Sequence, residues 1–181
     1  MRRSLLLLLS LGTVQACSAS TSAAPSTRPA VQTIGGADAG RTTLVATSAA
    51  DVSQLSYAAD AVWRVLPSVF DSLAIPLSTV DQARKEIGNT GLKVRRRLGN
   101  VPLSRYLDCG NTQMDPNADN YDIVLTVLSR VTPNGVTAAT LTTTVEAQAR
   151  PATYSQAYSR CSSKGGLELR LADLVKARLG R

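Results

Sequence analysis

Residues 121–149 read YDIVLTVLSRVTPNGVTAATLTTTVEAQA, and this stretch decides the fold of the chain. Apolar residues recur at every second position in its first half, and its second half is rich in threonine, with valine among the residues that alternate with it. Both features predict strands, which we place at 121–131 and 136–149. The turn sequence Thr132-Pro133-Asn134-Gly135 separates them, so we expect an antiparallel hairpin.

Helices and further strands are predicted on both sides of this hairpin. Short β-branched or apolar runs between turn signals predict strands at 42–47, 77–81 and 86–89. Apolar residues at helical spacing predict helices at 57–73 and 167–179. The order of one strand, a helix, several strands and a closing helix predicts an α+β fold. We expect a single antiparallel sheet with both helices packed on one face and the other face solvated.

The first predicted helix contains a proline and two aromatic residues. Pro67 removes one i→i−4 hydrogen bond and predicts a kink or a break near Leu66. Trp63 and Phe70 stand seven residues apart and are expected to share the buried face. Their side chains either pack in the core or line a pocket for a small hydrophobic ligand between the sheet and the helices.

A basic segment, GLKVRRRLG at 91–99, follows the strand predicted at 86–89. With a period of two residues, Lys93, Arg95 and Arg97 face solvent while the apolar residues between them face the core. Arg96 falls on the apolar side, so we expect it near a strand end with its charge reaching solvent. The three solvent-facing cations are either a solvated surface that protects a sheet edge or a docking face for anionic lipid headgroups, glycan or an acidic partner.

The first 17 residues have the organisation of an export signal. Two arginines precede a run of leucines, and Val14-Gln15-Ala16-Cys17 closes the segment. The apolar stretch of about ten residues is shorter than the ~20 that a membrane-spanning helix needs, so we predict a signal peptide over 1–16. The closing tetrapeptide resembles the lipobox of bacterial lipoproteins. This resemblance implies that Cys17 is acylated and becomes the first residue of the mature chain.

The lipobox resemblance also implies a location, and the composition of the residues that follow indicates how the mature chain is divided. By the sorting rule of enterobacterial lipoproteins, Ser18 after the acylated cysteine directs the protein to the outer membrane, facing the periplasm. Residues 17–40 are rich in Ser, Ala, Thr, Pro and Gly and predict a flexible tether. Residues 41–181 then form a single domain. Removal of the signal peptide leaves 18 basic against 13 acidic residues, a net charge of +5 that suits an anionic neighbour.

Two further cysteines, Cys109 and Cys161, remain in the predicted domain. In an oxidising envelope such a pair is most simply a structural disulfide. The bridge would join the loop before the hairpin to the start of the last helix. A redox-active pair is disfavoured, because the two cysteines are not in a C-x-x-C arrangement.

The chain contains no histidine, which excludes Ser-His-Asp and Cys-His catalysis and histidine-ligated zinc. Residues 115–122 begin like an EF-hand calcium loop, but Asn120 and Thr126 stand where that loop has glycine and glutamate. We therefore predict no metal and no cofactor. Aromatic residues make up only 4% of the chain, which argues against nucleic-acid binding by stacking. A hydrolase that uses paired carboxylates stays open, although no spacing singles out a pair.

The order of elements across residues 57–179 resembles the helix-grip-type domains of outer-membrane assembly lipoproteins such as BamC. This resemblance implies an antiparallel sheet that holds the helices on one face. Together with the lipobox, the tether and the missing catalytic groups, it leads us to expect a non-enzymatic binding or scaffold module anchored to the cell envelope by lipid. The alternative is a periplasmic carrier of a small hydrophobic ligand.

Overall fold

The computed structural model describes residues 32–34, 42–44, 50–112, 115–153 and 155–180. Its helices are α1 (Ala59–Ser72), the one-turn α2 (Asn117–Asn120) and α3 (Gly166–Leu179), with a 3₁₀ turn η1 (Leu103–Arg105). Its strands are β1 (Gln32–Ile34), β2 (Thr42–Leu44), β3 (Asp51–Leu55), β4 (Thr79–Asp81), β5 (Glu86–Arg95), β6 (Arg97–Leu98), β7 (Val101–Pro102), β8 (Leu107–Asp108), β9 (Asp122–Pro133), β10 (Ala139–Arg150) and β11 (Ser159–Ser163).

The predicted hairpin forms the centre of the main sheet. Strands β9 and β10 pair antiparallel over their whole length, from Ala139 opposite Pro133 to Arg150 opposite Asp122. Every second residue of each strand is buried, with the intervening residues half-buried or exposed. The buried positions are apolar or small, so the hydrophobic alternation in the sequence determines which face of the hairpin meets the core.

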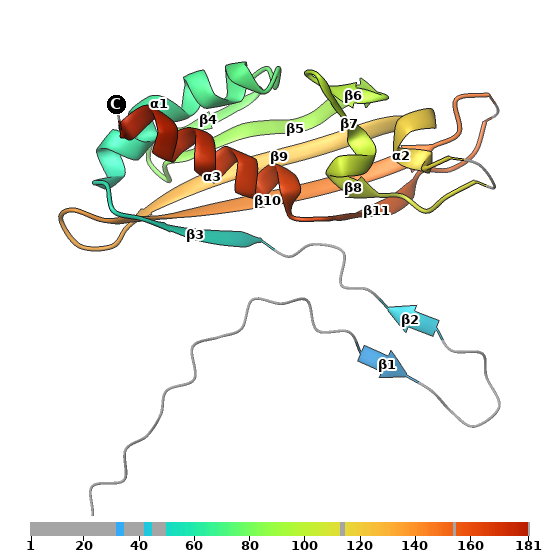
Figure 1. Ribbon diagram of the computed structural model, residues 1–181, viewed down its shortest axis with the longest axis horizontal. Coiled ribbons are helices and arrows are strands. Elements are labelled where there is room, and N and C mark those ends of the chain that lie inside the picture. Colours follow the sequence, from blue (N-terminus) through green and yellow to red (C-terminus); the bar gives the residue numbers. More distant parts are fainter. Residues whose placement is uncertain (1–31, 35–41, 45–49, 113–114, 154, 181) are drawn as a thin grey trace, which may run out of the picture.

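The other strands extend this hairpin into a nine-stranded sheet, and all of its strand pairs are antiparallel. Strand β5 lies beside β9, and β10 is bordered by β3 along one half and by β11 near its other end (Figure 1). Neither β3 nor β11 was predicted from the sequence. The strands predicted at 77–81 and 86–89 correspond to β4 and to the first part of β5.

The strand predicted at 42–47 is not the first strand of this sheet. Residues 42–44 form β2, which pairs with β1 in a separate two-stranded sheet. Strand β1 falls within the segment 17–40 that we predicted as a tether. The signal peptide, the lipidation site Cys17 and most of the tether lie outside the described residues, so all three stay predictions.

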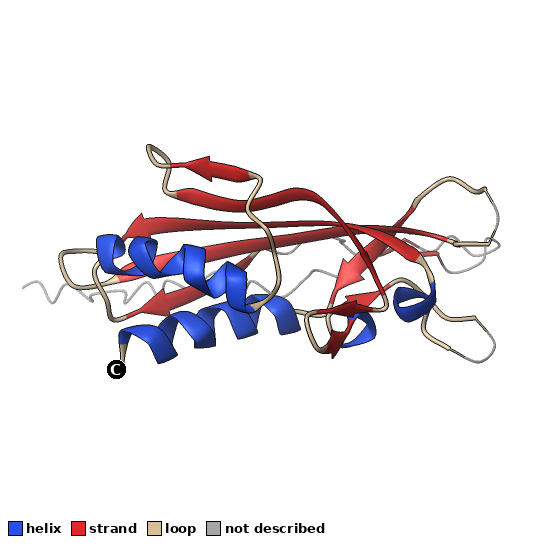
Figure 2. Ribbon diagram, turned by 90° about the horizontal axis from the view of Figure 1, so that it is seen from above, coloured by secondary structure: helices blue, strands red, loops and turns tan. Residues whose placement is uncertain are grey.

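Helices α1 and α3 pack side by side on one face of the sheet, as Figure 2 shows in side view. The hydrophobic core lies between this helix pair and the sheet. Residues from both layers are fully buried, among them Leu66 and Phe70 of α1, Leu171 of α3 and Leu125 of β9. The predicted α+β class, with two helices on one face of an antiparallel sheet, is confirmed.

The first helix differs from its prediction at Pro67. The structure has one continuous α-helix from Ala59 to Ser72 with Pro67 inside it, so the predicted break does not occur. Pro67 is exposed, while Val62, Leu66 and Val69 on the opposite side are fully buried. Their packing against the sheet compensates for the one hydrogen bond that proline removes.

The structure contains the predicted disulfide. Cys109 and Cys161 are joined with an S–S distance of 2.05 Å and stand 52 residues apart in sequence. Cys109 directly follows β8 and Cys161 lies in β11, two strands that also pair with each other. The bridge therefore joins the two ends of the segment that contains the central hairpin.

One acidic residue is buried in the first turn of α3. Glu168 is 2% exposed, and burial raises the pKa of its carboxyl group. One carboxyl oxygen accepts a 2.5 Å hydrogen bond from the Ser163 hydroxyl, while the other has no hydrogen-bond partner among the described residues. The nearby Asp51 carboxylate adds a smaller upward shift to this pKa.

Candidate functional site

The face of the sheet opposite the helices carries a row of polar side chains that crosses three strands and ends at the residue before a fourth. Arg95 of β5 stands opposite Asp122 of β9, which stands opposite Arg150 of β10. The guanidinium carbon of Arg150 lies 4.8 Å from the ring centroid of Tyr158, directly before β11. This first row thus alternates cation, anion, cation and aromatic ring.

A second row lies one register step further along the same face. Lys93 stands opposite Val124, Val124 opposite Gln148, and Gln148 opposite Arg160. Lys93 and Arg160 are both exposed, and neither forms an ion pair with any other described residue. The two rows together bring four cations and one carboxylate to one end of the open sheet face.

The local shape of β5 places two of these cations on this face. The register between β5 and β9 shifts between Thr90 and Leu92, so Gly91 is an extra residue and forms a β-bulge. The backbone N–H of Gly91 donates to the side-chain oxygen of Asn89 at 3.0 Å, and the amide nitrogen of Asn89 donates to the Pro76 carbonyl at 2.6 Å. Asn89 is 8% exposed and holds the bulge through both bonds.

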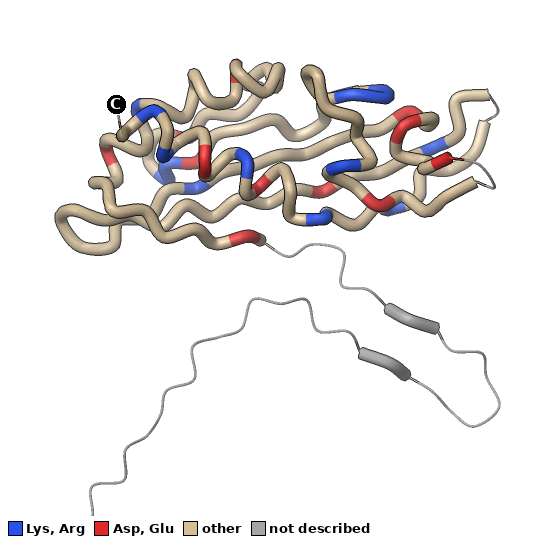
Figure 3. The backbone as a smooth tube through the Cα atoms, viewed as in Figure 1, with Lys and Arg blue, Asp and Glu red and all other residues tan. Residues whose placement is uncertain are grey.

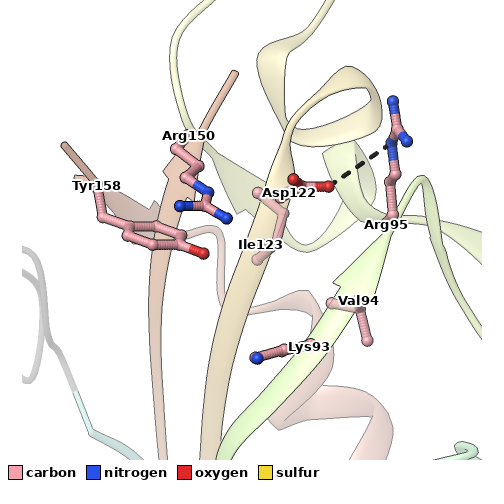
Figure 4. A pocket seen from close by; sticks show the side chains of 7 residues that line it. All are labelled: Lys93, Val94, Arg95, Asp122, Ile123, Arg150 and Tyr158. Carbon is pink, nitrogen blue, oxygen red and sulfur yellow. Dashed lines mark ion pairs between the residues drawn. The ribbon is translucent and has the colours of Figure 1, made fainter. Parts of the chain in front are cut away.

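The first row and Lys93 line a shallow pocket of about 320 Å³, which we call the basic pocket. Its polar lining residues are Lys93, Arg95, Asp122, Arg150 and Tyr158. Figure 4 shows Arg150 beside the ring of Tyr158, the pair of Asp122 and Arg95 to one side, and Lys93 below them. The volume is at the lower end of the range for small-ligand sites.

The charges of the basic pocket leave a positive excess. Asp122 and Arg95 form a loose ion pair with 3.8 Å between Oδ1 and Nε, and both side chains are about half exposed. Lys93 and Arg150 have no such partner among the described residues. Elsewhere basic and acidic residues are mixed along the chain, apart from the continuous basic segment 95–97 at β6 (Figure 3). The arrangement can bind an anion through charge-assisted hydrogen bonds.

The cations predicted from the sequence reach different places. Lys93 and Arg95 both lie in the basic pocket, and their predicted solvent-facing orientation agrees with their exposure. Arg96 forms the turn between β5 and β6 with φ of 66°, so it stands at a strand end as expected. Arg97 is exposed but belongs to β6, which reverses direction, and it does not line the pocket. The expected row of three cations is therefore interrupted by a turn.

Sequence reasoning missed Arg150, Tyr158 and Arg160. Arg150 directly follows the strand predicted at 136–149, and a period of two residues continued from that strand would put it on the solvated face. Tyr158 and Arg160 lie in a segment whose structure the sequence left ambiguous. No local signal shows that this segment returns beside β10, because the pairing of β11 with β10 is a long-range contact.

The two aromatic residues of α1 lie on the other side of the sheet from this pocket. Phe70 is completely buried within the core, and Trp63 is half-buried and packs against it. This agrees with the core-packing interpretation of the pair. Neither residue lines the basic pocket.

The fold and the site define an α+β domain with one helix-covered sheet face and one solvated face that carries a basic pocket. Comparison with family models, curated proteins and solved structures found no match to this chain.

Within the described ranges, no group of three or more Asp, Glu or Cys side chains could hold a metal ion. No helix in that same part of the chain has the length and apolar character needed to cross a bilayer.

Proposed function

We propose that this protein is a lipid-anchored component of the cell envelope that works as a non-enzymatic binding module. The observation that carries the proposal is the pair of rows on the open sheet face, which places Lys93, Arg95, Arg150 and Arg160 in two adjacent rows with the carboxylate of Asp122. This gathering favours an anionic partner, and the pocket between the rows gives that partner a defined position.

The basic pocket supports binding rather than catalysis. Its polar groups are cations, one paired carboxylate and a tyrosine. Glycoside hydrolysis by acidic residues needs two carboxyl groups flanking the reacting bond, and the pocket lining supplies only Asp122. The complete burial of Phe70 gives no support to a hydrophobic carrier with that residue as pocket lining.

Anion binding is tested by calorimetric titration of the full chain, purified in a nonionic detergent, with inorganic pyrophosphate at low and high salt. Replacement of Lys93 and Arg150 together by glutamine should weaken binding about tenfold or more. Arg64→Gln combined with Arg170→Gln is the matched control, because it also removes two exposed positive charges, from α1 and α3 on the opposite face. Equal binding by the double variant and the control would contradict the proposed site.

The lipid anchor is tested separately by fractionating cells that express the full chain. Cys17→Ala removes the proposed acylation site and should move the protein from the membrane fraction to the soluble fraction. Cys17→Ser serves as a second variant that keeps the polarity of the position. If both variants still sediment with the membrane, acylation of Cys17 does not hold the protein there.

A further inference from the structure

We propose that the basic pocket binds an acidic sugar, meaning a saccharide ring that carries an ionised carboxylate or phosphate group, as part of an envelope glycan. This inference rests on the proposed function, because it identifies the anionic partner of the same pocket. Four features of the pocket select a sugar over a bare anion, a lipid headgroup or an acidic protein segment: an aromatic surface, a carboxylate beside the cations, the lack of apolar anchors, and a compact shape.

The aromatic surface is the ring of Tyr158. The Arg150 guanidinium carbon lies 4.8 Å from its centroid, and the residue keeps 38% of its surface exposed. An aromatic face carries negative charge density and attracts the weakly positive C–H groups that line one side of a sugar ring. Arg150, held beside the ring by the cation–π contact, is then placed to donate two parallel hydrogen bonds to an acidic substituent of that sugar.

The carboxylate of Asp122 distinguishes a sugar from a simple inorganic anion. Its 3.8 Å separation from Arg95 is beyond hydrogen-bond length, so its oxygens can still accept hydrogen bonds from hydroxyl groups. Inorganic phosphate can contact Lys93 and Arg150, but its negative charge is also repelled by Asp122, whereas the neutral hydroxyl groups of a sugar are not. A sugar that carries both hydroxyl and acidic groups can direct its hydroxyls to Asp122 and its negative charge to Lys93 and Arg150.

The surroundings of the pocket do not favour a bilayer surface. Proteins that dock on lipid headgroups commonly insert apolar side chains into the interface in addition to their basic residues. The large hydrophobic residues exposed in the described part of the chain are Val52, Leu77, Val80, Val136, Tyr158 and Leu169. Only Tyr158 belongs to the pocket, so none of the exposed aliphatic side chains lies where it could anchor the pocket in a bilayer.

The shape of the site favours a sugar over an acidic protein segment. The site is a pocket of about 320 Å³ rather than a long groove, and the four cations lie within two adjacent register rows. One acidic ring can engage Arg150, Lys93 and Tyr158 together, whereas an extended peptide would follow a sheet edge or a groove.

The experiment is a calorimetric titration of the full chain in nonionic detergent with trigalacturonate and with its methyl ester, which has the same rings without the charges. Trigalacturonate should bind at least tenfold more tightly than the ester. Tyr158→Ala should weaken that binding several-fold, and Tyr158→Phe should leave it nearly unchanged, because the aromatic face is kept. Inorganic phosphate and phosphatidylglycerol vesicles are the competing probes.

The outcomes separate this inference from the proposed function. If phosphate or the vesicles bind as tightly as trigalacturonate, or if Tyr158→Ala binds like the native chain, the acidic-sugar assignment is wrong. The proposed anion-binding site is still supported by that result as long as the Lys93/Arg150 double variant loses binding to the same probe. If the double variant binds every probe as the native chain does, the proposed site and the sugar assignment both fail.

Discussion

The disulfide between Cys109 and Cys161 should supply a large share of the stability of the domain. It closes a segment of 52 residues that contains the central hairpin of β9 and β10. In the chain-entropy model, crosslinking a loop of this length removes enough freedom from the unfolded chain to stabilise the fold by about 4 kcal/mol. A small domain has a free energy of unfolding of only about 5–15 kcal/mol. Replacement of both cysteines by alanine should therefore bring it close to unfolding.

Guanidinium-induced unfolding, followed by the fluorescence of Trp63, measures this effect. Trp63 is the only tryptophan of the chain, and it packs half-buried against the core, so its emission reports the loss of the fold. The alanine pair should unfold at a much lower denaturant concentration and with a steeper dependence on it, because its unfolded chain is more expanded. Reductant should shift the native curve toward that of the alanine pair and leave the pair itself unchanged. A loss below about 1 kcal/mol would refute the entropic reasoning.

Two further changes test the interior of the domain. Because burial raises the pKa of Glu168 in the folded state, the native chain should lose stability as pH rises from the ordinary glutamate range through this raised value, and level off above it. Thermal unfolding of Glu168→Gln should show a weaker pH dependence and, at neutral pH, a gain of about 1 kcal/mol. If the stability of Glu168→Gln depends on pH as strongly as that of the native chain, groups other than Glu168 cause the dependence. Asn89→Ala leaves the N–H of Gly91 without its acceptor and should cost about 1–3 kcal/mol in denaturant unfolding. Thr90→Ala, at an exposed neighbouring position, is its control, and an equal loss in both variants would contradict the role of Asn89.

Local periodicity was sufficient to predict the layers of this fold. The central hairpin and the two long helices each carry a repeat that can be read within a dozen residues, and the structure has all of them near their predicted positions. The disulfide followed from counting the cysteines that remain once Cys17 is set aside as the predicted lipidation site. The break considered at Pro67 does not occur, because the local effect of proline on a helix was weighed without the packing of the neighbouring buried residues.

The site could be predicted only in part, because it depends on pairing between distant segments. Lys93 and Arg95 have a clear local pattern, but Arg150 and Tyr158 reach them through the β9–β10 and β10–β11 registers. Glu168 was missed for a related reason. Its position in the helix pattern does not mark it as buried, and its burial becomes visible only when β10 and β3 are placed beneath α3.

The bulge at Gly91 is the feature that joins the core to the basic pocket. Before the bulge, Ile87 and Asn89 face the helices and are buried. An uninterrupted period of two would continue this face through residues 91, 93 and 95 and bury the side chains of Lys93 and Arg95. The extra residue shifts the phase by one, so that Leu92 and Val94 pack toward the core and the two cations emerge on the open face. A sequence that specified only a longer regular strand would have no basic pocket at this end of the sheet, so the hydrogen bonds of Asn89 that hold the bulge support both the fold and the proposed binding site.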